Sequence, residues 1–110
     1  MKKNNEFSHV HNNVVFVANQ MSAAPADFVE ETYHTLKQIE NDLHSNNSSK
    51  DSVLKVNIYV PNMDCWQSIE KAYQNFFGAV QPANTIIPTS NEMASISFEV
   101  IAEKNVYYAC

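Results

Sequence analysis

The chain has 110 residues, the length of one ordinary domain, and we expect a single domain over residues 1–110. It is acidic, with a formal net charge of -5 at pH 7, and all 7 of its basic residues are lysine, which excludes bidentate recognition of a carboxylate or phosphate by arginine. An acidic chain without arginine and without clustered lysine argues against nucleic acid as a partner.

No targeting or metal-binding segment stands out. The first residues are polar and no apolar stretch follows them, so we expect neither a signal peptide nor a membrane span, and we place the protein in the cytoplasm. Cys65 and Cys110 suggest no disulfide framework, and no spacing of Cys and His resembles a zinc site. His9 and His11 would share a strand face and could supply a base or two metal ligands, but without a third ligand we interpret them as surface histidines. We therefore expect no metal and no cofactor.

The first half of the chain predicts two strands followed by a helix. Residues 7–11 form a short strand, and Asn12-Asn13 is a good turn pair. Residues 14–18 are apolar on both faces, which is typical of a strand buried on both sides. Ser22 is a candidate N-cap, and apolar residues recurring every three or four positions predict a helix over residues 26–44.

The rest of the chain is arranged around residues 53–77. Residues 53–60 alternate between apolar and polar side chains, with Leu54 on the apolar side, and this period of two predicts a strand with one apolar face. Asp64 is a candidate N-cap for an amphipathic helix over residues 65–77. A strand and a helix this short cannot each find a separate core, so we expect them to pack on one another.

Two more strands complete the chain. Gly78, the only glycine, is a natural C-cap for the second helix. A brief strand follows over residues 85–87 and a last one over residues 94–102. The order is therefore strand, strand, helix, strand, helix, strand, strand, which predicts an α+β sandwich with two helices packed on one face of a sheet.

Two helices cover only one side of such a sheet. We expect Val15, Val17, Val53 and Tyr59 to project from the side that the helices leave bare. Apolar surface exposed on that scale usually marks an interface. The pattern therefore predicts a homo-oligomer whose binding sites lie where subunits meet.

Segments spread over nearly the whole chain match one known family. They are residues 7–8 and 14–20, the strand at residues 53–59, the helix at residues 66–77, Pro82-Ala83 and the closing strand at residues 96–102. Together they resemble the Rid family, the reactive intermediate deaminases also called YjgF-like proteins or L-PSP endoribonucleases. The resemblance implies a chorismate-mutase-like fold with a mixed sheet, and a homotrimer with three clefts between subunits. Active members hydrolyse reactive enamines and imines, such as 2-aminoacrylate, to keto acids and ammonia.

The chain departs from the active family at the positions that hold the substrate. Asn84 stands where the family places an arginine right after Pro-Ala to hold the substrate's carboxylate. An amide carries no charge, and charge-assisted hydrogen bonds are roughly twice as strong as neutral ones. Phe7 replaces a tyrosine and has lost its hydroxyl group. Glu99 is the one polar site position that survives.

Four further positions differ from the family pattern. Ala18 and Asn19 replace the Ser-Gly pair before Gln, which removes a hydroxyl group and a conformationally free residue. Ile86 stands where a cysteine is common, and Glu70 where an asparagine is often found. The resemblance thus makes Asn84, Phe7, Ala18, Asn19, Ile86 and Glu70 candidate ligand-binding positions.

Each position also has a purely structural interpretation. Glu99 either positions or activates a water molecule in a cleft or is an exposed carboxylate on the polar face of a strand, and the resemblance favours the cleft. Asn84 either binds a neutral ligand or caps a turn before a strand. Phe7, Ala18 and Ile86 either make the cleft more apolar than is usual in the family or belong to ordinary core packing.

Two hypotheses of function follow. The preferred one is a non-catalytic homotrimer that binds a small apolar or neutral molecule in its inter-subunit clefts, or serves as a protein-interaction module, because most residues that would carry the chemistry are replaced. The alternative is a hydrolase, an enamine and imine deaminase with an altered substrate range, in which Glu99 is the catalytic residue. The endoribonuclease activity in the family's name has less support still, because an acidic surface without arginine should repel RNA.

Overall fold

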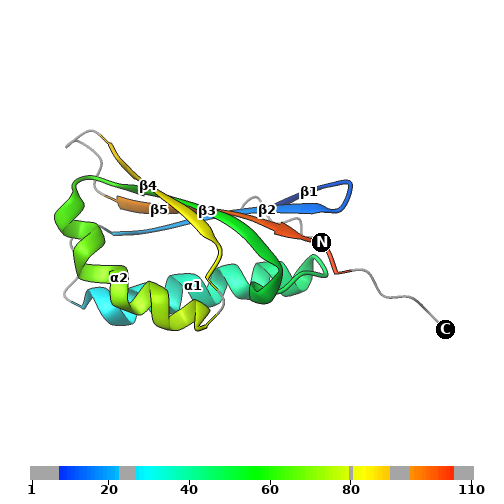
Figure 1. Cartoon of the computed structure of the whole chain (residues 1–110), viewed down its shortest axis with the longest axis horizontal. Helices are drawn as coiled ribbons and strands as arrows, with labels where there is room; N and C mark the ends of the chain where they lie inside the picture. Colours follow the sequence, from blue (N-terminus) through cyan, green and yellow to red (C-terminus); the bar gives the residue numbers. More distant parts are fainter. Residues whose placement is uncertain (1–7, 23–26, 80, 90–94, 106–110) are drawn as a thin grey trace.

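In the computed structural model, residues 8–22, 27–79, 81–89 and 95–105 are described. Two α-helices lie against one face of a five-stranded sheet and leave the other face bare (Figure 1). The elements in chain order are β1 (Ser8–His11), β2 (Val14–Ser22), α1 (Phe28–Ser45), the 3-10 turn η1 (Lys50–Ser52), β3 (Val53–Val60), α2 (Met63–Phe77), β4 (Ala83–Pro88) and β5 (Ser95–Glu103). The predicted order of strands and helices and the α+β sandwich are confirmed.

The sheet is mixed, with the strand order β1-β2-β5-β3-β4. All neighbours are antiparallel except β3 and β4, which run parallel because α2 connects them as a crossover. The last strand of the chain therefore lies in the middle of the sheet, between β2 and β3. In the described ranges no helix is long and apolar enough to cross a membrane.

The pairing of β2 with β5 decides which side chains of β2 face the helices. Val15 pairs with Ala102 and Val17 pairs with Val100, and all four are buried on the helix side. The prediction that Val15 and Val17 project from the bare face is therefore wrong. Successive side chains alternate between the faces of a strand, so Phe16 lies on the bare face, where 41% of its surface is exposed. The strand is thus not buried on both sides within one chain.

A β-bulge changes the start of β3. The pairing with β5 shifts between Val53 and Lys55, so the alternation of side chains slips by one residue there. Val53 is consequently buried and Leu54 is 49% exposed, which reverses the prediction for both residues. Beyond the bulge the predicted alternation holds, and Tyr59 lies on the bare face as expected, opposite Ser97.

The helix ends show which capping signals the chain uses. Ser22 belongs to β2, and the N-cap of α1 is Asp27, whose side chain accepts a hydrogen bond of 3.1 Å from the backbone N–H of Glu30. The N-cap of α2 is Asn62 and not Asp64, which lies in the first turn of the helix. Gly78 ends α2 with a φ of 75°, and its predicted role as C-cap is confirmed.

The parallel strand β4 lies at one edge of the sheet. It ends at Pro88, which has no backbone N–H to donate. The next residue, Thr89, turns its backbone N–H back to the carbonyl oxygen of Val60 at 2.8 Å. At the C-terminal end of β4, Pro88 therefore offers no N–H outside the sheet, and the N–H of Thr89 points inward to β3.

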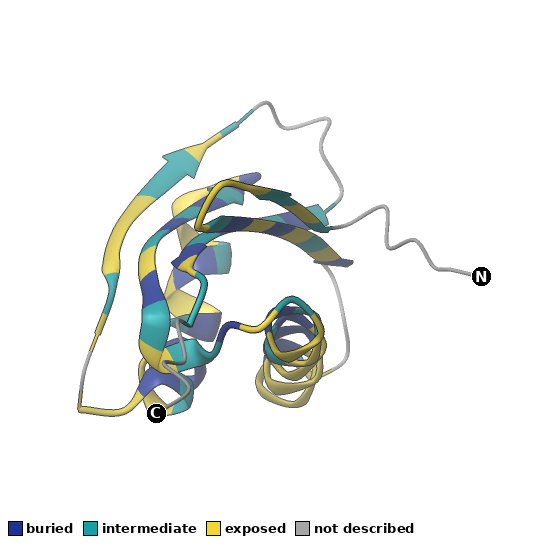
Figure 2. Cartoon of the chain, turned by 90° about the vertical axis from the view of Figure 1, so that its right-hand side faces the viewer, coloured by how far each residue is buried: buried dark blue, intermediate teal, exposed yellow. Residues whose placement is uncertain are grey.

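The hydrophobic core fills the space between the sheet and the helices, as the distribution of buried residues in Figure 2 shows. At its centre Tyr73 is fully buried against three aromatic rings, those of Trp66, Phe77 and Phe98. Its hydroxyl group has no hydrogen bond of normal geometry among the described residues. Burial raises the pKa of Tyr73 to about 12, and the nearby Asn84 side chain acts in the opposite direction.

The unpaired hydroxyl group makes Tyr73→Phe a test of the core. An unsatisfied buried polar group costs roughly 1–3 kcal/mol, so we expect this substitution to raise the free energy of unfolding by about 1 kcal/mol in urea denaturation. The raised pKa adds a pH signature. Because the folded chain keeps the phenol proton to about pH 12 and an unfolded tyrosine loses it near pH 10.0, the contribution of Tyr73 is fully present below pH 10.0 and is lost as the pH rises through its folded pKa.

In Tyr73→Phe the fall in stability between pH 10 and 12 should become shallower. Tyr33→Phe is the matched control, since Tyr33 is exposed on α1 and its substitution should leave the alkaline part of the curve unchanged. A loss of stability in Tyr73→Phe at neutral pH would mean that the hydroxyl group has a hydrogen-bond partner.

Candidate functional site

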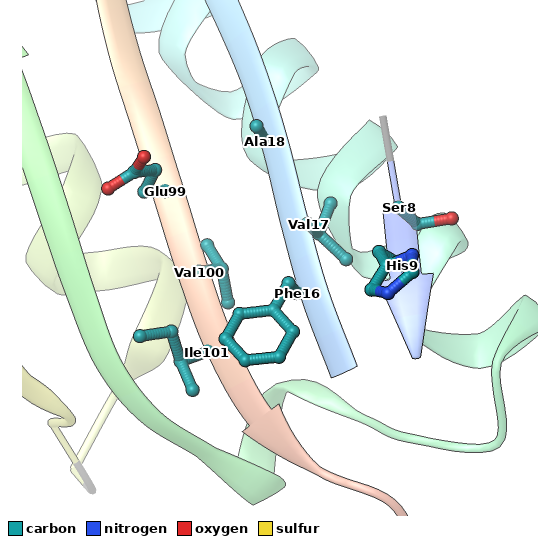
Figure 3. A pocket seen from close by; sticks show the side chains of 8 residues that line it. All are labelled: Ser8, His9, Phe16, Val17, Ala18, Glu99, Val100 and Ile101. Carbon is teal, nitrogen blue, oxygen red and sulfur yellow. The ribbon is translucent and has the colours of Figure 1, made fainter. Parts of the chain in front are cut away.

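A groove lies on the bare face of the sheet, where β1, β2 and β5 run side by side. It has a volume of about 410 Å³ and is lined mainly by apolar side chains (Figure 3). The lining residues are Ser8, His9, Phe16, Val17, Ala18, Glu99, Val100 and Ile101. Glu99 supplies the only carboxylate of this lining, and Figure 3 shows its oxygens turned toward β3.

A second hollow of about 400 Å³ continues the groove along β2 and β5. It is lined by Ala18, Asn19, Gln20, Tyr59, Ser97, Phe98 and Glu99. Ala18 and Glu99 are common to both hollows and are direct partners in the pairing of β2 with β5. Because the side chain of Ala18 is a single methyl group, space remains beside the carboxylate. We refer to the two hollows together as the Glu99 groove.

Two side chains of β3 hold the carboxylate of Glu99. The hydroxyl group of Tyr59 donates a hydrogen bond of 2.9 Å to Oε1, and the amide Nδ2 of Asn57 donates one of 3.3 Å to the same oxygen. Asn57 is the direct partner of Glu99 in the pairing of β3 with β5. The second oxygen, Oε2, has no hydrogen-bond donor among the described residues. The arrangement thus fixes the carboxylate through a single oxygen and leaves Oε2 able to accept a hydrogen bond from a further donor.

The contact with Glu99 changes the pKa of Tyr59. The hydrogen bond to Glu99 raises the pKa of Tyr59 above its ordinary value, and partial burial and the negative charge of Glu99 act in the same direction. A hydrogen bond to a carboxylate stabilises the protonated phenol, while a neighbouring negative charge disfavours the phenolate. Tyr59 therefore remains a hydrogen-bond donor to Glu99 throughout the physiological pH range.

No lysine lines the Glu99 groove. Lys55 stands on the same face of β3, but its Nζ donates a hydrogen bond of 2.6 Å to the hydroxyl group of Thr85, on the side away from β5. Nowhere in the described ranges do three or more His, Cys, Asp or Glu side chains gather closely enough to hold a metal ion. The groove therefore offers a fixed carboxylate, the His9 imidazole and uncharged polar groups beside its apolar side chains.

The structure brings Ala18 and Asn19 to this groove, but not Asn84 or Ile86. Asn84 and Ile86 lie on β4 and pair with Val56 and Ile58, whose side chains point into the core on the helix side. Asn84 and Glu99 are thus on opposite faces of the sheet, and β3 lies between their strands. Within one chain they cannot contact the same small ligand.

Asn19 and Glu70 make side-chain hydrogen bonds to residues other than Glu99. Asn19 borders the second hollow, but its side chain amide donates a hydrogen bond of 3.1 Å to Gln38 on α1. Glu70 is on α2 and accepts a hydrogen bond of 3.3 Å from Gln74, one helical turn away. Phe7 lies outside the described residues. Of the positions predicted to bind a ligand, only Ala18 and Asn19 line the same groove as Glu99.

The sequence alone does not single out Asn57 and Tyr59 as site residues. Alternation places both on the polar face of their strand, and it places Glu99 on the polar face of the last strand. The missing information is that β3 and β5 are neighbours, since 40 residues separate Tyr59 from Glu99 in the chain. The signal that the sequence does contain is a pair of polar side chains, an Asn and a Tyr, on the same face of one predicted strand.

Known proteins share this fold and much of the sequence pattern. A model of the family described as "Endoribonuclease L-PSP" matches residues 2–103. The chain belongs to this family. A RutC family protein from Pyrococcus abyssi is 27% identical over 101 residues, which covers 84% of this chain and 80% of that protein. Protein HMF1 from Saccharomyces cerevisiae is 24% identical over 97 residues, covering 83% of this chain and 75% of HMF1. The resemblance to Rid and YjgF-like proteins is confirmed.

Solved structures agree on the fold. Yeast Mmf1 superposes with a TM-score of 0.80 at 20% identity and covers 96% of this chain and 90% of Mmf1. The YjgF gene product from E. coli gives a TM-score of 0.75 at 16% identity, over 90% of this chain and 87% of that chain. The predicted YjgF-like fold is therefore confirmed for this member of the L-PSP family.

The contact between Tyr59 and Glu99 predicts a titration effect. In Glu99→Ala the pKa of Tyr59 should fall toward the ordinary tyrosine value of 10.0, because the hydrogen bond and the negative charge are both removed. NMR of ζ-13C-labelled tyrosine measures this, with Tyr59→Phe assigning the signal. Glu103→Ala, which removes an exposed carboxylate from the end of the same strand, should leave the Tyr59 pKa where it is. An unchanged Tyr59 pKa in Glu99→Ala would mean that the contact does not persist in solution.

Proposed function

We propose that this L-PSP family member is a non-classical homotrimer that binds a small molecule in clefts between its subunits, without a cation to hold a substrate carboxylate. The supporting observation is the charge of the Glu99 groove. Its lining contains one carboxylate and no lysine, and the sequence contains no arginine. The position after Pro82-Ala83, which in active members holds the arginine, is the uncharged Asn84.

Electrostatics makes this arrangement unfavourable for an anionic substrate. Two unit charges at 4 Å interact by about 1 kcal/mol in water and by about 4 kcal/mol near a protein surface. A substrate carboxylate entering beside Glu99 would meet repulsion of this order, and Lys55 is engaged with Thr85. A ligand without negative charge avoids this cost and gains contact with the apolar walls.

The placement of the site residues supports a cleft between subunits. Asn84 and Glu99 occupy opposite faces of the sheet, so a ligand that meets both must lie between two copies of the chain. The bare face also carries Phe16, with 41% of its surface exposed, beside the half-buried Ile101. A second copy that packed against this face would cover part of both side chains and turn the Glu99 groove into a cleft between subunits.

One observation favours the alternative, an enamine or imine deaminase. Tyr59 and Asn57 hold Oε1 of Glu99, while Oε2 accepts no hydrogen bond from the described residues. A carboxylate held in this way can accept a proton from a water molecule within about 2.6–3.2 Å, which is the geometry of a general base. The hydrolase would then require a substrate that does not depend on a carboxylate for binding.

The two functions are separated by a turnover assay. With 2-aminoacrylate generated enzymatically, we expect no release of ammonia or keto acid above the background rate, because nothing in the groove holds the substrate's carboxylate. The outcome that would establish the deaminase instead is turnover by the natural chain that disappears in Glu99→Ala.

An arginine in place of Asn84 should increase the affinity for carboxylic acids. In Asn84→Arg the affinity for a small carboxylic acid such as 2-oxobutyrate should rise roughly tenfold, because a hydrogen bond between charged groups contributes about 1.5–3 kcal/mol. Asn84→Gln lengthens the side chain without charge and should have no such effect. Isothermal titration calorimetry measures both variants. If Asn84→Arg and Asn84→Gln bind the acid with equal affinity, Asn84 lies outside the binding cleft.

The assembly is tested by light scattering. We expect three times the monomer mass at micromolar concentration. Phe16→Asp should shift the protein toward the monomer, since it places a charge on the apolar part of the bare face. Val29→Asp is the matched control, because Val29 is 51% exposed on α1 and does not belong to that face. A natural chain that is strictly monomeric would refute the trimer.

A further inference from the structure

The charge and shape of the Glu99 groove specify a class of ligand more closely than the proposed function does. We propose that the groove binds a small protonated amine with an apolar body, its ammonium group on Oε2 of Glu99 and its body along Phe16 and Ile101. This inference rests on the proposed function, because it names the ligand class of the same site.

The first step concerns the hydrogen bonds of the carboxylate. Both protein donors, from Tyr59 and Asn57, reach Oε1. The other oxygen, Oε2, has no donor among the described residues, and it is an acceptor only, since an ionised carboxylate has no proton to donate. A ligand group that pairs with it must therefore be a donor. An ammonium group offers three donors and a positive charge, and such charge-assisted hydrogen bonds are roughly twice as strong as neutral ones.

The second step concerns the walls of the groove. Figure 3 places the ring of Phe16 and the side chain of Ile101 on one stretch of the groove floor, with Glu99 farther along β5. A volume of about 410 Å³ lies in the range of roughly 300–1,000 Å³ that is usual for small-molecule sites. An amine with a ring or short chain can bury its body there while its charged end reaches the carboxylate.

The charges of the lining favour a cation over an anion. Glu99 is common to both hollows, and neither hollow is lined by a lysine.

Three probes of one shape test the inference. Benzylamine, benzyl alcohol and benzoate carry a positive charge, no charge and a negative charge on nearly the same body. We expect titrations of the full chain, followed by 1H–15N NMR at the Ala18 and Glu99 amides, to give an affinity for benzylamine at least about five times that for benzyl alcohol. Benzoate should bind weakest of the three.

Three variants locate the effect. In Glu99→Gln, benzylamine and benzyl alcohol should bind equally. Glu31→Gln removes the same charge from an exposed position on α1, on the helix side of the sheet, and should keep the fivefold preference. Ala18→Leu fills the space beside the carboxylate and should weaken all three probes.

The affinities of the three probes for the natural chain test the amine inference even if a variant fails to fold. If benzyl alcohol binds as tightly as benzylamine, the amine inference is wrong, while the proposal of a small-molecule cleft without a cation stands. If benzoate binds tightest, both are wrong. If no probe shifts the Ala18 and Glu99 amides at millimolar concentration, the groove does not take ligands of this class and the inference is overturned, whatever the mass found by light scattering.

Discussion

β5 pairs with β2 on one side and with β3 on the other, and this double pairing determines the face to which the side chains of all three strands point. Phe98 and Val100 face the helices and are buried. Glu99, the residue between them, must then emerge on the bare face, where the same pairing brings Ala18 and Asn57 beside it. One register therefore sets both the core and the candidate site. A slip of the pairing by one residue would turn the buried side chains to the bare face and the site side chains to the helix side.

This dependence explains what the sequence can and cannot predict about the fold. The order of elements follows from periodicity, because α1, α2, β3 and β5 each have a clear apolar face. The face of β2 does not follow, since residues 14–18 are apolar throughout and either choice satisfies the pattern. Which residue caps a helix depends on the local backbone conformation. From the sequence, Ser22 is as suitable an N-cap as Asp27, and Asp64 is as suitable as Asn62.

The candidate site is predictable only in part, for a different reason. The resemblance to a family identifies Glu99, and alternation on the strand gives its face. The partners Tyr59 and Asn57 require knowledge of which strands are neighbours. Asn84 and Glu99 point to opposite sides of the sheet, which follows from the register of β3 with β4 and β5 and not from the sequence pattern alone.

The two edges of the sheet differ in how they are protected from pairing with foreign strands. An exposed edge offers unpaired backbone groups to any extended segment, and short strands and proline are common defences against this. β1 is only 4 residues long. β4 is longer and ends in Pro88, while Thr89 returns its N–H to Val60. An edge strand that ends in proline resists growth into a fibril, so the β4 border of the sheet is protected at its C-terminal end from acting as a template for aggregation.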